Sequence, residues 1–115
     1  MGSTIRIVKP TSVVKAVQER RSSVRCRCLG ACAVSLPGYR IVPGLTYNLS
    51  RSGVGVALLR PVLVGTKLVV EKVGWPDTRS LRATVVRHQL LGFAWLHGCR
   101  LSTPMSDEEL RDWLK

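Results

Sequence analysis

The sequence predicts an all-β fold: a six-stranded antiparallel barrel that ends in a short helix and is preceded by a flexible N-terminal arm. The first observation behind this prediction is a series of six apolar, strand-like segments separated by glycine, proline and other turn residues. Their spacing, roughly 8–12 residues, is typical of a small barrel or sandwich. The second observation is a helix-start signal near the C-terminus, which predicts a helical lid.

Six segments carry the signals of strands. The fifth is the clearest, because Leu81, Ala83 and Val85 alternate with residues suited to the outer face. The third is apolar on both faces, which predicts a central position. The second is interrupted by Pro43 and Gly44, which indicates an edge strand or a bulge. The expected strands are residues 24–36, 40–47, 54–59, 66–73, 79–87 and 95–101.

Turn-forming residues separate these segments. Connections are expected at residues 36–39, 61–65, 74–77 and 88–92. Near the C-terminus, Ser106 and Glu109 have the spacing of a capping box, in which each side chain accepts a hydrogen bond from the other residue's backbone amide. The helix that they begin should bury Leu110, Trp113 and Leu114 along one stripe.

The N-terminal residues show no sustained hydrophobic period. We expect residues 1–17 to form an arm and residues 18–115 to form the barrel domain. The length of 115 residues suits one domain with a single core. No apolar run approaches the roughly 18 residues of a membrane span, and charged residues interrupt the N-terminus too often for a signal peptide. The expected location is therefore the cytoplasm.

The formal net charge of +11 is extreme for a domain of this size. It predicts an anionic partner, which the charge alone leaves open as a nucleic acid, lipid headgroups or a phosphorylated small molecule. No Ser–His–acid arrangement or carboxylate pair stands out among only seven acidic residues, so an enzyme is not expected. His88 lies beside an expected turn and should be exposed, whereas His97 alternates with Trp95 and Cys99 and should be structural.

Four cysteines raise the question of a metal site. Cys26, Cys28, Cys32 and Cys99 lack the two C-x2-C-like knuckles that zinc ribbons usually show. Cys26 and Cys28 instead alternate with arginines, which is the period of a strand. We therefore expect small buried core residues, with neither a bound metal nor a disulfide.

Two polar stretches stand out as a candidate binding site. Asn48, Ser50 and Gly53 lie in an expected bend between two apolar strands, where short polar side chains bond the backbone and glycine permits a positive φ or the close approach of another group. Arg21 and Arg25 lie four residues apart just before the first strand-like segment. Amide and hydroxyl groups beside a pair of guanidinium groups suit a small, flat, anionic ligand.

The motif Arg21-x-x-x-Arg25, followed by Asn48-x-Ser50-x-x-Gly53, resembles the paired signature of the PilZ family. Residues 64–66, 84–87 and 98–101 agree with the same family, and the resemblance runs from about residue 18 to 114. PilZ domains are bacterial receptors for cyclic di-GMP built on a six-stranded barrel. The resemblance implies a signalling receptor that binds this dinucleotide, needs no cofactor and has no enzymatic activity.

The resemblance also implies roles for single residues. Arg21 and Arg25 match the pair that grips guanine and phosphate, a task that suits the forked guanidinium group. Arg20 is similar to the arginine of members that bind a stacked ligand dimer. Asn48 stands where the family usually has aspartate, and its amide offers one acceptor oxygen where a carboxylate offers two. The implied ligand-binding residues are Arg20, Arg21, Arg25, Asn48, Ser50 and Gly53.

Binding would bring the arginine arm onto the barrel and change the surface seen by a protein partner or an attached domain. The alternative function is a small basic β-barrel that binds single-stranded nucleic acid through a basic groove and stacking aromatic side chains. The aromatic residues speak against it, because Trp75, Trp95 and Trp113 are expected in a turn, a strand and the helix.

Overall fold

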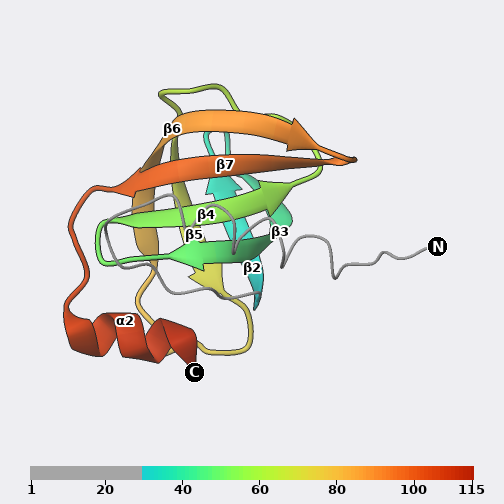
Figure 1. The fold of residues 1–115 in the computed structure, drawn as a ribbon. Coiled ribbons are helices and arrows are strands. Elements are labelled where there is room, and N and C mark those ends of the chain that lie inside the picture. Colours follow the sequence, from blue (N-terminus) through green and yellow to red (C-terminus); the bar gives the residue numbers. More distant parts are fainter. Residues whose placement is uncertain (1–29) are drawn as a thin grey trace.

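The computed structural model describes residues 30–115, and the expected arm, Cys26 and Cys28 lie outside this range. Six strands close into an antiparallel barrel with one C-terminal helix, as predicted (Figure 1). The order around the barrel is β2-β3-β4-β7-β6-β5, and β5 pairs back onto β2. The elements are β2 (Gly30–Leu36), β3 (Arg40–Leu49), β4 (Gly53–Leu58), β5 (Lys67–Lys72), β6 (Leu81–Leu91), β7 (Ala94–Leu101) and α2 (Asp107–Leu114).

The core fills the barrel with the apolar side chains that alternate inward along the strands. Val34, Val56 and Val70 are fully buried. In β6 the predicted alternation holds, because Leu81, Ala83 and Val85 are buried. β4 is buried along nearly its whole length and lies between β3 and β7, as its apolar sequence predicts.

The structure differs from two expectations about the strands, the edge or bulge at Pro43 and Gly44 and the turn at residues 88–92. Closure of the barrel leaves β3 without a free edge, and Pro43 pairs in register with Ala33. The bulge in β3 lies further along, between Thr46 and Asn48. The turn expected at residues 88–92 is also shorter: β6 and β7 stay paired out to Leu91 and Ala94, and Gly92 makes the turn with a φ of 63°. Pairing with β7 thus keeps residues 88–91 extended, although their sequence has the features of a turn.

The capping box is present as predicted. Ser106 Oγ accepts a hydrogen bond from the Glu109 amide at 3.1 Å, and Glu109 Oε1 accepts one from the Ser106 amide at 2.9 Å. Of the predicted helical stripe, Trp113 is buried and Leu110 packs against the core, whereas Leu114 is exposed. Lys72 holds the far end of the helix by donating to the carbonyls of Trp113 and Lys115 at 2.8 and 2.7 Å.

The antiparallel order sorts the connections between two ends of the barrel. The connections β2–β3, β4–β5 and β6–β7 lie at one end, which we call the hairpin end (residues 37–39, 59–66 and 92–93). The β3–β4 and β5–β6 connections and α2 lie at the other, which we call the motif end (Figure 1). Across residues 30–115 the chain forms no helix of the length and apolarity that crossing a membrane requires.

Candidate functional site

Three of the six predicted site residues meet at the motif end, around the β3–β4 turn. Asn48 lies near the end of β3, Ser50 follows that strand, and Gly53 begins β4. The turn is closed by a hydrogen bond of 2.9 Å from the Ser50 amide to the Gly53 carbonyl. Asn48 and Ser50 are buried, with 2% and 9% of their surfaces exposed.

The bulge in β3 decides which way these side chains face. Thr46 pairs with Val56, but Asn48 pairs with Gly55, so Tyr47 is an extra residue on β3. Cross-strand partners share a face, and Val56 belongs to the core. Asn48 is therefore on the outer face of the barrel, whereas the next residue, Leu49, returns to the core. If Tyr47 were a regularly paired residue, strand alternation from Thr46 would send Asn48 into the interior.

Asn48 also carries an unsatisfied acceptor. Its Oδ1 atom is buried and has no hydrogen-bond partner, and it is the only such side-chain atom in the part of the chain that the structure describes. A buried polar atom without a partner costs about 1–3 kcal/mol of stability. A native structure rarely tolerates such an atom without a reason. One reason is that a hydrogen-bond donor of a ligand contacts Oδ1 when the ligand is bound.

A row of cross-strand partners with two glycines at its centre continues from Asn48 across the barrel wall. Asn48 pairs with Gly55, Gly55 with Gly98, and Gly98 with Arg87. These four residues, which we call the glycine row, cover three strand spacings, or roughly 14 Å. A Cβ on Gly55 would lie 2.7 Å from the Tyr47 ring, and one on Gly98 would lie 3.2 Å from the Arg87 side chain. Tyr47 and Arg87 thus lie over the two glycines.

A second bulge places Arg87. The register between β6 and β7 shifts between Val85 and Arg87, so Val86 is the extra residue there. Val85 is buried in the core, while Arg87 is exposed and reaches over Gly98 on the outer face. The glycine row therefore ends in a cation, which suits an anionic ligand lying across the wall.

Of the two properties expected of a glycine at this bend, a positive φ or the close approach of another group, Gly53 does not use the first. The positive-φ glycines of residues 30–115 are Gly38, Gly65, Gly74 and Gly92. It is extended and pairs with Arg100 of β7. The turn therefore depends less on glycine torsion freedom than on hydrogen bonds to the following segment.

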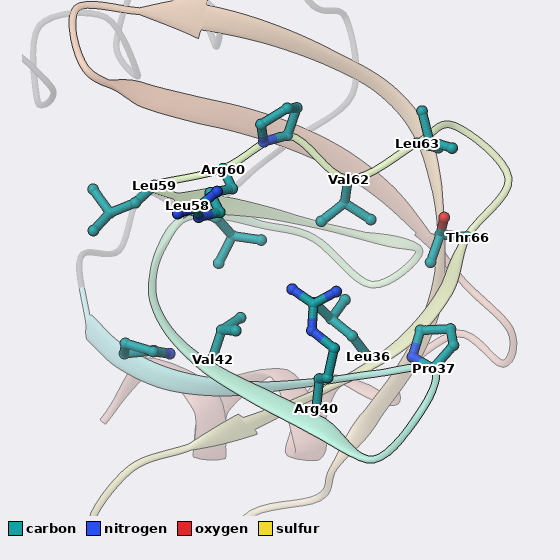
Figure 2. Close-up of a pocket in the computed structure, with 12 residues that line it drawn as sticks. Leu36, Pro37, Arg40, Val42, Leu58, Leu59, Arg60, Val62, Leu63 and Thr66 are labelled. Carbon is teal, nitrogen blue, oxygen red and sulfur yellow. The ribbon is translucent and has the colours of Figure 1, made fainter.

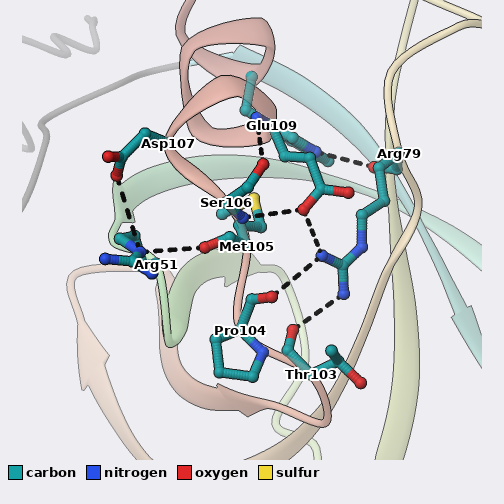
Figure 3. Close-up of polar contacts among 9 residues, drawn as sticks. Arg51, Arg79, Thr103, Pro104, Met105, Ser106, Asp107 and Glu109 are labelled. Carbon is teal, nitrogen blue, oxygen red and sulfur yellow. Dashed lines mark hydrogen bonds and ion pairs between the residues drawn. The ribbon is translucent and has the colours of Figure 1, made fainter.

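Those hydrogen bonds tie the turn to the segment before α2 (Figure 3). The Met105 amide donates to the Arg51 carbonyl at 2.7 Å, and Arg51 Nε donates to the Met105 carbonyl at 3.1 Å. Leu101 donates to the Ser52 carbonyl at 2.9 Å. The β3–β4 turn is thus fixed on two sides, which holds Asn48 and Ser50 in a defined place.

Arg79 fixes the same segment from the β5–β6 connection (Figure 3). Its guanidinium group donates to Glu109 at 2.9 Å and to the Thr103 carbonyl at 2.8 Å. The hydrogen bond from the Ser106 amide lowers the pKa of Glu109 below its ordinary value, and Arg79 adds to this effect. Helix start and site turn are therefore parts of one hydrogen-bonded unit.

The other predicted site residues, Arg20, Arg21 and Arg25, lie outside the described residues, so their position relative to Asn48 stays a prediction. The sequence reasoning did not place Tyr47, Arg87 or the two row glycines in the site. Residues 84–87 and 98–101 carried a signal, because both belong to the family resemblance. The pairing of Gly98 with Arg87 depends on a bulge, which no local sequence pattern indicated.

Within residues 30–115, the histidine and cysteine side chains line or fill the barrel interior. His97 is fully buried and accepts a hydrogen bond of 2.9 Å from the Val62 amide, so its structural role is confirmed. His88 is half-buried, with Nδ1 3.0 Å from the Val62 carbonyl, and the expectation of an exposed side chain was wrong. Cys32 and Cys99 are buried core residues, as predicted, and burial raises the pKa of the Cys99 thiol to about 12. Residues 30–115 contain no cluster of three metal-ligating side chains.

The family model of the PilZ domain matches residues 19–115. This chain belongs to the PilZ family. No curated protein matches the chain. Among solved structures, this PilZ domain is similar to the inhibitor of motility MotI/DgrA of Bacillus subtilis, with a TM-score of 0.57 and 19% identity over 80% of this chain.

The chain is also similar to the PlzA protein of Borreliella burgdorferi, whose crystal structure is a complex with c-di-GMP. Here the TM-score is 0.54 and the identity 8% over 91% of this chain. The matches cover 48% of the MotI/DgrA chain and 54% of the PlzA chain, so this PilZ domain spans about half the length of either protein. At these identities the likeness concerns the fold.

Proposed function

We propose that this PilZ domain is a receptor for cyclic di-GMP without enzymatic activity. The observation that carries the proposal is the unpartnered, buried Oδ1 of Asn48, which lies at the second motif of a PilZ signature. Guanine presents hydrogen-bond donors at N1 and N2, and an amide oxygen can accept from either. The c-di-GMP complex of the structurally similar PlzA supports the same ligand class.

The glycine row is the proposed floor of the binding site. With no side chain at Gly55 and Gly98, a flat purine or a sugar–phosphate could approach the barrel wall closely if the Tyr47 ring and the Arg87 side chain, which lie over the two glycines, moved aside. Arg87 at the end of the row would contact a phosphate through charge-assisted hydrogen bonds. Its exposed position and the absence of an ion pair to it within residues 30–115 leave the guanidinium group available.

Arg21 and Arg25 are proposed to complete the site with guanidinium groups on guanine and phosphate, and Arg20 to contact a second, stacked ligand molecule. Because Asn48 Oδ1 is covered, ligand contact with it requires a change in the surrounding structure. We propose that this change involves the arginine segment closing on the ligand. A protein partner or an attached domain would then meet a different surface.

The test is calorimetric titration of the full chain with cyclic di-GMP. Arg21→Ala and Arg25→Ala should each weaken binding by about tenfold to more than hundredfold, since a hydrogen bond to a charged group is worth roughly 1.5–3 kcal/mol. Arg82→Ala is the matched control, because Arg82 is exposed and pairs with Val69, away from the glycine row. Wild-type affinity in both arginine variants would refute the proposal.

Titration with single-stranded DNA, at a low and a high salt concentration for both ligands, tests the alternative function in the same experiment. Binding through the nucleic-acid backbone falls steeply with salt, whereas a dinucleotide held by specific hydrogen bonds should depend on salt much less. In residues 30–115 the tryptophans form no common platform: Trp113 is buried, Trp75 is exposed and Trp95 is half-buried. We therefore expect the dinucleotide to be the tighter ligand at both salt concentrations.

A further inference from the structure

The hairpin end of the barrel exposes an unusual number of large apolar side chains. Tyr39 at the tip of the β2–β3 turn is fully exposed, Leu63 in the β4–β5 loop is 76% exposed, and Phe93 in the β6–β7 turn is 72% exposed. All three connections at this end therefore present an apolar side chain to solvent. The full set, which we call the apolar end, is Tyr39, Ile41, Leu59, Leu63, Val64, Leu90, Leu91 and Phe93.

In the part of the chain that the structure describes, acidic groups are missing from this end. The sequence contains no aspartate or glutamate between residues 30 and 70 or between residues 78 and 106. The acidic residues of the described range are instead found in Glu71, the β5–β6 connection and α2, toward the motif end. Arg40 and Arg60 supply positive charge at the hairpin end, and neither forms an ion pair or a side-chain hydrogen bond within residues 30–115. The molecule is therefore polarised along the barrel.

The two arginines lie beside an apolar cavity of about 470 Å³ between the β2–β3 and β4–β5 connections (Figure 2). Its walls are formed mainly by leucine, valine and proline side chains. Figure 2 shows Arg40 extending its guanidinium group into the opening from β3, with Arg60 near Leu58 on the other wall. Apolar side chains next to uncompensated guanidinium groups suit a surface that presents anionic groups over hydrocarbon.

We propose that the hairpin end docks on an anionic lipid bilayer, with the three apolar connections inserted at the interface and Arg40 and Arg60 at the level of the headgroups. Large exposed apolar patches mark protein or membrane contacts. Three observations favour the membrane: the apolar groups lie on three separate loops, the most exposed one is a tyrosine, whose amphipathic ring suits the interface, and the charge is polarised toward this end. Anionic leaflets attract basic surfaces, and buried apolar area adds to the binding.

This surface is independent of the proposed dinucleotide site. Asn48 and Ser50 belong to the motif end and the glycine row crosses the barrel wall, whereas the apolar end is formed by the opposite connections of the same barrel. The two sites can therefore be occupied together. Membrane docking can also be measured without cyclic di-GMP, so its outcome does not depend on the function proposed above.

The experiment is sedimentation of the full chain with vesicles of phosphatidylcholine, with or without phosphatidylglycerol. Leu63→Ser/Phe93→Ser removes two apolar contacts and leaves the net charge unchanged. Val73→Ser/Trp75→Ser is the matched control, since Val73 and Trp75 are exposed apolar residues in the β5–β6 connection at the motif end. Thermal unfolding of both variants verifies that they fold.

We expect binding to the anionic vesicles, and a loss of at least about tenfold in the first variant only, because burying a large apolar side chain is worth about a decade or more in affinity. Equal binding of both variants would mean adsorption through charge alone and would overturn the proposal. No sedimentation of the wild type, or equal sedimentation with pure phosphatidylcholine, would overturn it too.

A second measurement reports insertion directly. Leu63→Trp and Val73→Trp each add one tryptophan to the same chain, at opposite ends of the barrel. Brominated lipids in the anionic vesicles should quench the Leu63→Trp protein more strongly. Equal quenching in the two proteins would contradict insertion of the hairpin end.

Discussion

Asn48 pairs with Gly55 across a register that Tyr47 has shifted by one residue. This relationship places a polar side chain on the outer wall of the barrel and returns Leu49 to the core immediately afterwards. It also aligns Asn48 with the glycine row, because Gly55 pairs in turn with Gly98 on the next strand. One extra residue thus creates both the orientation of the candidate ligand acceptor and the flat surface beside it.

Replacing Asn48 by leucine should separate stability from binding. The substitution removes the buried, unpartnered oxygen, so the free energy of unfolding should stay unchanged or rise by up to about 1 kcal/mol. Dinucleotide binding should be lost, because the acceptor for guanine is gone. Urea unfolding and calorimetry on the same preparation measure both effects. If the variant is destabilised by several kcal/mol, Asn48 serves the turn instead of a ligand.

Arg87→Ala should weaken cyclic di-GMP binding by about tenfold or more, because a charge-assisted contact is worth roughly 1.5–3 kcal/mol. Arg82 lies on the same strand and is also exposed, but it pairs with Val69 of β5. Arg82→Ala should therefore bind like the wild type and controls for the change in net charge. Equal affinities of the two variants would remove Arg87 from the site.

The two glycines of the row should respond differently to alanine. At Gly55 the new methyl group would lie within 3.0 Å of three atoms of the Tyr47 ring, so the ring must move and stability should fall by about 1–3 kcal/mol. At Gly98 the neighbour is the flexible Arg87 side chain at 3.2 Å, so the stability loss should be smaller. Both variants should bind the dinucleotide more weakly. Similar melting temperatures of the two variants would contradict the tighter packing of the Tyr47 ring on Gly55.

Acid should weaken the fold through His97. Desolvation by burial lowers the pKa of His97 below its ordinary value of 6.5, and the nearby His88 acts in the same direction. The folded protein therefore binds this proton less readily than the unfolded chain. The stabilising effect is complete above pH 6.5 and is lost as the pH falls below it, by at most about 1.4 kcal/mol per pH unit.

The loss has a local cause that can be tested. A protonated His97 can no longer accept the hydrogen bond from the Val62 amide. Urea unfolding of the wild type and of His97→Gln on either side of pH 6.5 measures the effect. The variant should be less stable at neutral pH and should lack this part of the pH dependence. An identical slope in both proteins would assign the acid sensitivity to other groups.

Much of the fold could be predicted from the sequence, because its signals are local. Alternation identified the inward residues of β6, and the spacing of Ser106 and Glu109 gave the capping box. The prediction failed where partners distant in sequence decide the outcome. Residues 88–91 look like a turn alone, but pairing with β7 keeps them extended.

The candidate site shows the same division. The motif residues Asn48, Ser50 and Gly53 could be recognised from spacing, and the structure brings them to one turn. Arg87 and Gly98 are distant in sequence from that turn. They are aligned with Asn48 and Gly55 only by the β4–β7 and β6–β7 strand pairings. Their place follows from register, which sequence patterns specify weakly.

The extra residue at position 47 has a consequence for how this protein tolerates changes in chain length. Deleting Tyr47 would join Thr46 to Asn48, and the regular pleat would then keep Asn48 on the outer wall and Leu49 in the core, although the ring over Gly55 would be lost. The same holds for Val86 on β6, because Val85 and Arg87 already face opposite sides. Deleting a regularly paired residue of either strand would instead turn the residues on one side of the gap to the wrong face. Single-residue deletions at positions 47 and 86 should therefore damage the fold far less than deletions elsewhere in β3 and β6.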